Sequence, residues 1–260
     1  MSTSKPVVLT IAGLDPSGGA GIVADIKTIS ALGCFPAAAL TSITYQNTTG
    51  VFGAEHQTAA TLRARVEPIV QDLNVAGAKT GMLPTAEIVA EVARLFSEEK
   101  LPTPVVDPVV VATSGDVLID DEAFQILKTK LFPLARVVTP NIPEAEKLAG
   151  FAIESQSDML RAAEVIQSIG ARAVLVKGGH RSFGDQALDI LLTEGGIFTE
   201  FRAEYLDVGE VHGSGCTLSA AIAACLGKGM TLEDAVAAAK KYVTDAIRTA
   251  PRIGRGARPL

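Results

Sequence analysis

A cysteine between glycines opens the penultimate apolar segment of the chain. Residues 212–219 read His-Gly-Ser-Gly-Cys-Thr-Leu-Ser and lead into an alanine-rich stretch. Glycines at a helix start leave backbone N–H groups open to an anion, and the helix dipole adds positive potential there. That potential favours a thiolate, so we expect a lowered pKa at Cys216 and a role as general base or as nucleophile. The residues of this candidate anion hole are Gly213, Ser214, Gly215 and Cys216.

A second glycine-rich turn, from Gly13 to Gly21, follows the first apolar run. It lacks the Lys-Ser/Thr ending of a P-loop and does not fit G-x-G-x-x-G. Its glycines allow a ligand close to the backbone, although a tight turn without a ligand fits equally well. Asp25 lies four residues beyond it, and Gln46 ends the next apolar run. The Gln46 amide both donates and accepts, which suits the amino-and-ring-nitrogen edge of a heterocycle, while capping is the alternative role for either residue.

Carboxylates and lysines follow later apolar runs. Asp107 and Glu144 are separated carboxylates of the kind that hold Mg²⁺ together with phosphates and water. Glu144 also stands near a predicted helix start, where capping is the alternative role. Lys177 ends another apolar run and offers positive charge to phosphates, whereas Lys240 by itself is typical of a solvated surface lysine.

Short apolar runs alternate with amphipathic segments along most of the chain, which predicts βαβ units around a largely parallel sheet. The predicted strands are 7–11, 37–45, 76–80, 105–107, 137–139 and 173–177, and the predicted helices are 22–32, 62–73, 86–99, 121–131, 143–149 and 157–169. Ligands bind at the carboxyl edge of such sheets, so we expect the polar strand-end residues to share a cleft. Those residues are Asp15, Gln46, Asn47, Lys79, Thr80, Asp107, Thr139, Asn141 and Lys177.

The last third of the chain has a different pattern. The runs 186–192 and 196–201 are joined by Glu-Gly-Gly, which predicts a hairpin and an antiparallel end to the sheet. Two helices follow, over 215–227 and 231–249. Residues 252–260 contain glycine, arginine and proline, and we expect a loose tail.

The composition excludes several classes of protein. With 260 residues, 48% hydrophobic and 20% charged, the chain is predicted to fold rather than to be disordered. A net charge of −6 argues against bulk binding to nucleic acid or to an anionic membrane. Three cysteines indicate a reducing cytoplasm rather than a disulfide framework, and Cys34 and Cys225 are expected to be small buried side chains. No signal peptide, membrane span or linker is apparent, so we expect one domain over 1–260.

Taken together, these motifs resemble the ribokinase-like superfamily, and within it the hydroxymethylpyrimidine/phosphomethylpyrimidine kinases of thiamine biosynthesis. The matching stretches are TIAGLDPSGGAGI at 10–22, ADIKT at 24–28, QNT at 46–48, KTGML at 79–83, DPV at 107–109, TPNIPEA at 139–145, KGGH at 177–180 and GSGCTLS at 213–219. They follow the family's order over nearly the whole chain. Together they are specific, although each alone is weak.

The resemblance implies a three-layer α/β/α kinase with a mostly parallel sheet that uses ATP and Mg²⁺. Its implied reactions phosphorylate 4-amino-5-hydroxymethyl-2-methylpyrimidine to the monophosphate and then to the diphosphate, in a cytoplasmic homodimer. Cys216 would be the catalytic base. The resemblance also implies substrate contacts by Gly13, Asp25, Gln46 and Met82, metal contacts by Asp107 and Glu144, and nucleotide contacts by Thr139, Asn141, Lys177 and Lys240.

Three other functions fit parts of the pattern. A pyridoxal or pyridoxine kinase shares the fold and the anion hole, a nonenzymatic pyrimidine- or nucleotide-binding regulator needs only the pocket, and an acyl-transfer enzyme would use Cys216 as nucleophile. The chain also departs from the family pattern. It has Gly-Ser-Gly-Cys for the usual Gly-Thr-Gly-Cys, Gly-Glu-Val-His at 209–212 where Asn-Thr-His is usual, and an arginine-rich end in place of a histidine-bearing one.

Overall fold

Nine strands form one central sheet in the order β3-β2-β1-β4-β5-β6-β7-β8-β9. The computed structural model describes residues 5–99, 101–110, 118–182 and 186–260, with the side chains of 180–182 left aside. The five pairings from β2 through β7 are parallel, as the alternation of strands and helices predicts. The sheet strands are β1 Val7–Leu14, β2 Phe35–Asn47, β3 Gly50–His56, β4 Val75–Thr80, β5 Val105–Val106, β6 Val137–Val138, β7 Val174–Ser182, β8 Gln186–Leu192 and β9 Phe198–Glu204.

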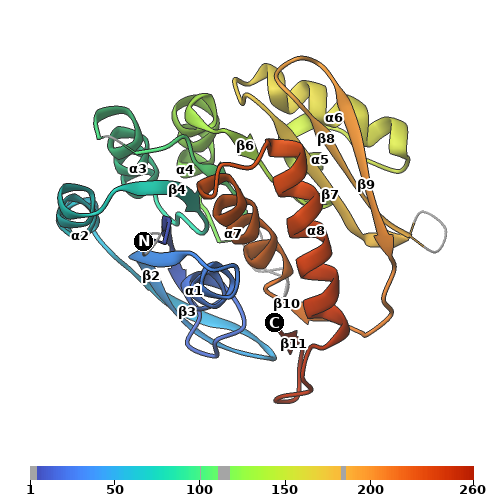
Figure 1. Ribbon diagram of the computed structural model, residues 1–260, viewed down its shortest axis with the longest axis horizontal. Coiled ribbons are helices and arrows are strands. Elements are labelled where there is room, and N and C mark those ends of the chain that lie inside the picture. Colours follow the sequence, from blue (N-terminus) through green and yellow to red (C-terminus); the bar gives the residue numbers. More distant parts are fainter. Residues whose placement is uncertain (1–4, 100, 111–117, 183–185) are drawn as a thin grey trace.

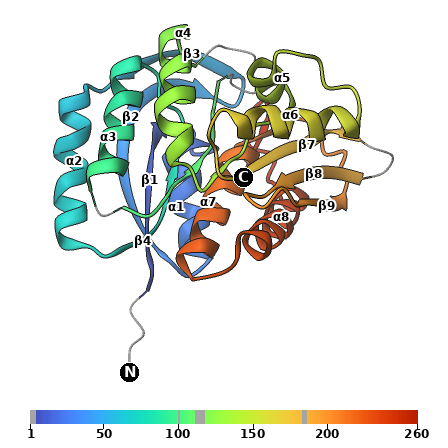
Figure 2. The same cartoon turned by 90° about the horizontal axis from the view of Figure 1, so that it is seen from above.

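Helices cover both faces of the sheet, which confirms the three-layer α/β/α architecture (Figures 1 and 2). One face carries α2 Ala59–Asp72, α3 Ala86–Glu98, α4 Asp121–Ile126, α5 Ile142–Ala149 and α6 Gln156–Ser168, and the other carries α1 Gly21–Ala31, α7 Ser214–Gly227 and α8 Leu232–Arg248. A π-helical turn, η1 Leu127–Leu131, and a 3₁₀ turn, η2 Phe132–Leu134, continue α4.

Successive side chains of each strand point to opposite faces and so fill two separate cores. Val8 joins the core beneath α1, α7 and α8, whereas its neighbour Leu9 joins the core beneath α2 to α6. Val105 and Val106 divide in the same way. A sheet buried on both faces requires continuous apolar strands, which is why these runs are recognisable in the sequence.

Both edges of the sheet are antiparallel. The predicted hairpin of β8 and β9 is confirmed, although β9 begins later and extends to Glu204. At the opposite edge β3 pairs antiparallel with β2, a strand that the sequence patterns do not indicate. The burial of β3 explains this, because three of its seven residues are half-buried and none is buried, so no apolar run marks it.

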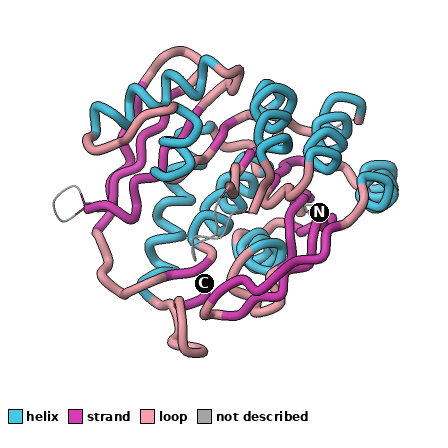
Figure 3. The backbone as a smooth tube through the Cα atoms, turned by 180° about the vertical axis from the view of Figure 1, so that it is seen from behind, coloured by secondary structure: helices cyan, strands magenta, loops and turns pink. Residues whose placement is uncertain are grey.

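The prediction of a loose tail is wrong. Arg258–Pro259 forms β11 and pairs in parallel with β10, Val211–His212, which leads directly into α7. The tail also crosses the β2–β3 turn, where Thr48 accepts hydrogen bonds from the backbone N–H groups of residues 255, 256 and 257. Figure 3 shows the C-terminal end beside the β2–β3 hairpin. A glycine- and arginine-rich segment is thus ordered by contacts with distant segments.

Candidate active site

The N-terminus of α7 forms the centre of the polar cluster at the carboxyl edge of the sheet. Gly213 is the N-cap residue and has φ 87°, a left-handed conformation that favours glycine. A Cβ on Gly213 would lie 1.8 Å from the carbonyl oxygen of Gly19, so the two predicted glycine-rich loops are packed against each other. No side chain caps α7, which leaves its first N–H groups available to an anion.

Lys177 and Asp107 lie beside this helix start. Lys177 Nζ is 3.0 Å from Asp107 Oδ1, and Asp107 also accepts hydrogen bonds from the hydroxyls of Thr139 and Ser219. A Cβ on Gly215 would lie 3.2 Å from Lys177 Nζ. Burial lowers the pKa of Lys177, but Asp107 and Glu144 outweigh this and raise it, so the ammonium stays charged beside the N-terminus of α7.

Glu144 has the capping role that the sequence leaves open. It forms a capping box with Asn141, the N-cap residue of α5, and its second oxygen accepts from the backbone N–H of Val110. Burial raises the pKa of Glu144, Lys177 opposes this and Asp107 adds to it. The predicted nucleotide contact Asn141 is therefore also a structural residue of this turn.

The carboxylates of Asp107 and Glu144 fit a magnesium site in their chemistry. Asp107 is close enough to raise the pKa of Glu144, and the oxygens of both carboxylates keep lone pairs beyond the hydrogen bonds they accept. Within the described ranges, no group of three or more His, Cys, Asp or Glu side chains could hold a metal ion. Mg²⁺ commonly uses one or two carboxylates with phosphates and water, so this pair suits an ion that arrives with a nucleotide.

The prediction of a lowered pKa for Cys216 is contradicted. Burial raises the pKa of its thiol to about 11, although Lys79 favours the thiolate, and Asp25 and Asp107 add to the increase. The cost of burying a negative charge near two carboxylates exceeds the effect of the helix dipole and of Lys79. The thiol nevertheless lies half-buried among charged groups rather than inside hydrocarbon.

Asp25 faces Lys79 across a fully buried ion pair. Lys79 Nζ lies 2.8 Å from both oxygens of Asp25, and Thr10 Oγ1 donates to Oδ2 at 2.6 Å. Burial raises the pKa of Asp25, and Lys79 opposes this. Burial likewise lowers the pKa of Lys79, but Asp25, Cys216 and Asp107 raise it to about 12. Neither side chain is exposed, and the substrate contact expected of Asp25 stays a prediction.

The Gly13–Gly21 loop is organised by Asp15. One carboxylate oxygen accepts from the N–H and hydroxyl of Ser17, and the other accepts from the N–H groups of Gly19 and Ala20. Burial raises the pKa of Asp15, but the hydrogen bonds from His212 and Ser17 lower it overall. The Asp-Pro-Ser-Gly sequence of an Asx turn is the signal that points to this role.

Gly13 and Met82, both predicted to line the substrate pocket, are in contact. A Cβ on Gly13 would lie 2.9 Å from Met82 Cε, so a larger residue there would displace the end of the Met82 side chain. The backbone oxygen of Met82 accepts from Thr41 Oγ1 at 2.7 Å. Gly13 lies near the end of β1 and Met82 follows β4, so their contact is expected of two neighbouring parallel strands.

Gln46 is held by a hydrogen-bond network that also includes His212. His212 Nε2 lies 2.9 Å from both Asp15 Oδ2 and the Gln46 amide, and Thr44 Oγ1 contacts the other amide atom at 3.0 Å. One ring nitrogen cannot donate to a carboxylate and accept from an amide nitrogen, so we place the amide oxygen toward His212. The Thr44 hydroxyl then donates to Leu14 O and accepts from the amide nitrogen. This leaves Gln46 one donor and one acceptor for a ligand.

Lys240 is not the solvated surface lysine that its isolated position in the sequence indicates. Its Nζ lies 2.8 Å from Asp189 Oδ2, and only 12% of its side chain is exposed. Asp189 Oδ1 accepts from the N–H of Gly178, next to Lys177. Lys240 therefore supports the end of β7 that carries Lys177.

A three-layer α/β/α fold with an uncapped helix N-terminus, a lysine and two carboxylates at the strand ends is typical of the ribokinase-like small-molecule kinases. The chain belongs to the phosphomethylpyrimidine kinase family, whose model matches residues 15–260. It is 44% identical over 257 residues to the hydroxymethylpyrimidine/phosphomethylpyrimidine kinase of Streptomyces coelicolor, covering 99% of this chain and 94% of that protein.

Solved structures of two related kinases superpose on the chain. The phosphomethylpyrimidine kinase of Clostridium difficile 630 has a TM-score of 0.82 at 40% identity, covering 94% of this chain and all of that one. The ADP complex of Bacillus subtilis pyridoxal kinase has a TM-score of 0.90 at 35% identity, covering 98% of this chain and 96% of that one. Across the described part of the chain, helices are too short or too polar to cross a membrane.

Proposed function

We propose that the protein transfers the γ-phosphoryl group of ATP to the hydroxymethyl group of 4-amino-5-hydroxymethyl-2-methylpyrimidine, and then phosphorylates the monophosphate to the diphosphate. The observation that carries this proposal is the meeting of the open α7 N-terminus with the Lys177–Asp107 pair at the sheet edge. Family membership supports the substrate class. We further propose Mg²⁺ as the metal, a homodimer as the assembly and the cytoplasm as the location.

The chain's own residues supply position and charge for the transfer. The acceptor oxygen forms a bond to the γ-phosphorus while the bond to the β,γ-bridging oxygen breaks, and ADP leaves. The N–H groups of residues 214–216 and the Lys177 ammonium stabilise the charge on the moving group. Mg²⁺ held by Asp107 and Glu144 would neutralise phosphate charge when bound.

Cys216 is the group proposed to take the acceptor's proton. Only its thiolate can do so, and with a pKa of about 11 that form is scarce at neutral pH and increases as pH rises. Gln46 offers its remaining acceptor to the pyrimidine amino group and its remaining donor to a ring nitrogen. Thr139 supports Asp107, and Lys240 supports the β7 end where the nucleotide is proposed to lie.

Product analysis tests the proposal directly. The protein is incubated with ATP, Mg²⁺ and the hydroxymethyl pyrimidine, and the monophosphate and diphosphate are separated by chromatography. We expect both products and a matching release of ADP. Binding of the pyrimidine with no ATP consumption would instead indicate a nonenzymatic regulator, and a covalent protein adduct independent of ATP would indicate acyl transfer through Cys216.

Pyridoxal phosphorylation is the second candidate, favoured by the superposition on the pyridoxal kinase. The same ADP-release assay with pyridoxal as acceptor separates the two. We expect the pyrimidine to be preferred because the Gln46 amide retains one donor and one acceptor that match an aminopyrimidine edge. Turnover of pyridoxal alone would reverse the assignment.

A further inference from the structure

A cavity of about 490 Å³ lies between the C-terminal tail and the segment that leads into β10. It is outside the anion hole and shares no lining residue with the predicted site. The lining residues are Asp207, Val208, Gly209, Glu210, Arg252, Ile253, Gly254, Arg255, Gly256 and Arg258. The volume is in the range typical of small-molecule sites.

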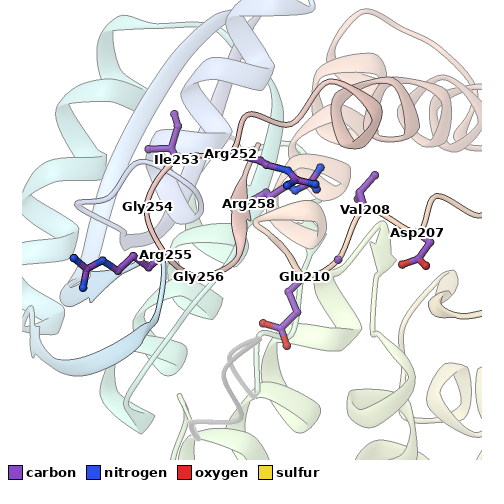
Figure 4. Close-up of a pocket in the computed structure, with 10 residues that line it drawn as sticks. Asp207, Val208, Glu210, Arg252, Ile253, Gly254, Arg255, Gly256 and Arg258 are labelled. Carbon is purple, nitrogen blue, oxygen red and sulfur yellow. The ribbon is translucent and has the colours of Figure 1, made fainter.

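Two guanidinium groups of this cavity converge. The side chains of Arg252 and Arg258 run toward the same part of the cavity beside Val208, whereas Arg255 points away from them (Figure 4). The carboxylates of Asp207 and Glu210 also line the cavity but point away from this pair.

Among the ion pairs of the described residues, none joins a carboxylate to Arg252 or Arg258. Arg63, Arg94 and Arg248, by contrast, each pair with a carboxylate. Arg252 is exposed and Arg258 is half-buried. Like charges repel, so an anion between the two guanidinium groups would be attracted by both of them.

We propose that the cavity binds a phosphate or diphosphate group of a small molecule between Arg252 and Arg258. Guanidinium groups bind phosphate oxygens through two parallel hydrogen bonds, and two of them suit a group with two or more negative charges. Val208, which lies beside the two guanidinium groups in Figure 4, would contact the less polar part of an organic phosphate. This site is separate from the anion hole and does not depend on the proposed kinase activity.

Such an anion would connect the tail to the active site. Arg258 donates its backbone N–H to Glu210 O and pairs with Val211 in the β10–β11 ladder. His212 follows in β10 and contacts both Asp15 and Gln46. Binding between Arg252 and Arg258 should therefore hold β11 on β10 and stabilise the folded protein by linkage.

Calorimetric titration of the full chain with inorganic pyrophosphate tests the site. We expect pyrophosphate to bind, with an affinity that falls at least about tenfold in the double variant Arg252→Gln/Arg258→Gln. Pyrophosphate binding should be unchanged in Arg172→Gln, which replaces an exposed arginine outside the cavity. It should also be unchanged in Lys177→Gln, which removes the lysine of the candidate active site. Equal affinity in the double variant and the wild type would overturn the proposal, as would an event lost only in Lys177→Gln or no binding at millimolar pyrophosphate.

Thermal unfolding provides a second readout. Pyrophosphate should raise the Tm of the wild type and of Arg172→Gln but not that of the double variant. If the double variant does not fold, Arg252→Lys and Arg258→Lys serve instead, because lysine keeps the charge and loses the two-pronged geometry. Each lysine variant should bind pyrophosphate more weakly than the wild type, and unchanged affinity in both variants would contradict the proposed site. Parallel titrations with inorganic phosphate distinguish a monophosphate from a diphosphate ligand.

Discussion

Lys79 and Asp25 form an ion pair with no exposed side-chain surface, in which the lysine nitrogen lies 2.8 Å from both carboxylate oxygens. The pair connects the end of β4 to α1. Cys216 and Asp107 are close enough to act on the pKa of Lys79. Lys79 is therefore a buried structural residue whose charge also influences the ionisable groups of the candidate active site.

Breaking this pair should destabilise the protein. Lys79→Met leaves a buried carboxylate without a partner, and we expect a loss of about 3–5 kcal/mol in the free energy of unfolding. The double variant Lys79→Met/Asp25→Asn removes both charges and should recover part of that loss. Urea unfolding followed by circular dichroism measures both. Strictly additive losses for the two substitutions would show that the side chains act independently.

The raised pKa of Cys216 predicts an alkaline pH dependence. Because only the thiolate accepts a proton and its pKa is about 11, kcat should rise between pH 7 and pH 10, by up to tenfold per pH unit. Cys216→Ser should reduce kcat and flatten this rise, while pyrimidine affinity stays nearly unchanged. Cys225→Ser, at a buried thiol outside the site, is the matched control. An alkaline rise that persists unchanged in Cys216→Ser would exclude Cys216 as the base.

His212 is expected to position Gln46 for the substrate. His212→Ala removes the hydrogen bond to the Gln46 amide and should raise KM for the pyrimidine about tenfold with a smaller change in kcat. Gln46→Ala should have a similar effect on KM, and the double variant should be little worse than either single one. Tyr45→Phe, at an exposed neighbour on β2, is the control. Independent, multiplying effects of His212→Ala and Gln46→Ala would contradict this positioning role.

Asp15 should contribute stability that depends on pH. Its pKa is lowered in the folded protein because the hydrogen bonds from His212 and Ser17 outweigh burial. A lowered pKa means that the contribution is complete above the unfolded value of about 3.8 and is lost as pH falls through the folded value. Asp15→Asn should therefore cost roughly 2–3 kcal/mol at pH 7. The difference between variant and wild type, measured by urea unfolding, should shrink below pH 4, and a constant difference would contradict this account.

Local patterns in the sequence predict most of the architecture. Apolar strands buried on both faces, helix caps such as Thr85 and glycines at tight turns depend on neighbouring residues, so their signals lie close together in the chain. The carboxyl edge of the sheet then places Gln46, Asp107, Thr139 and Lys177 in one region, because parallel strands end there together. The one-domain organisation expected for 1–260 stays a prediction.

Tertiary contacts decided what these patterns could not. The pKa of Cys216 depends on burial near Asp25 and Asp107, which outweighs the helix dipole. The order of the tail and the pairing of Lys79 with Asp25 likewise come from residues far apart in the chain. Local sequence determines where a helix or strand begins and which functional groups its side chains carry. Which charges are buried together follows only from the folded arrangement, because burial and Coulomb interactions depend on distance in space.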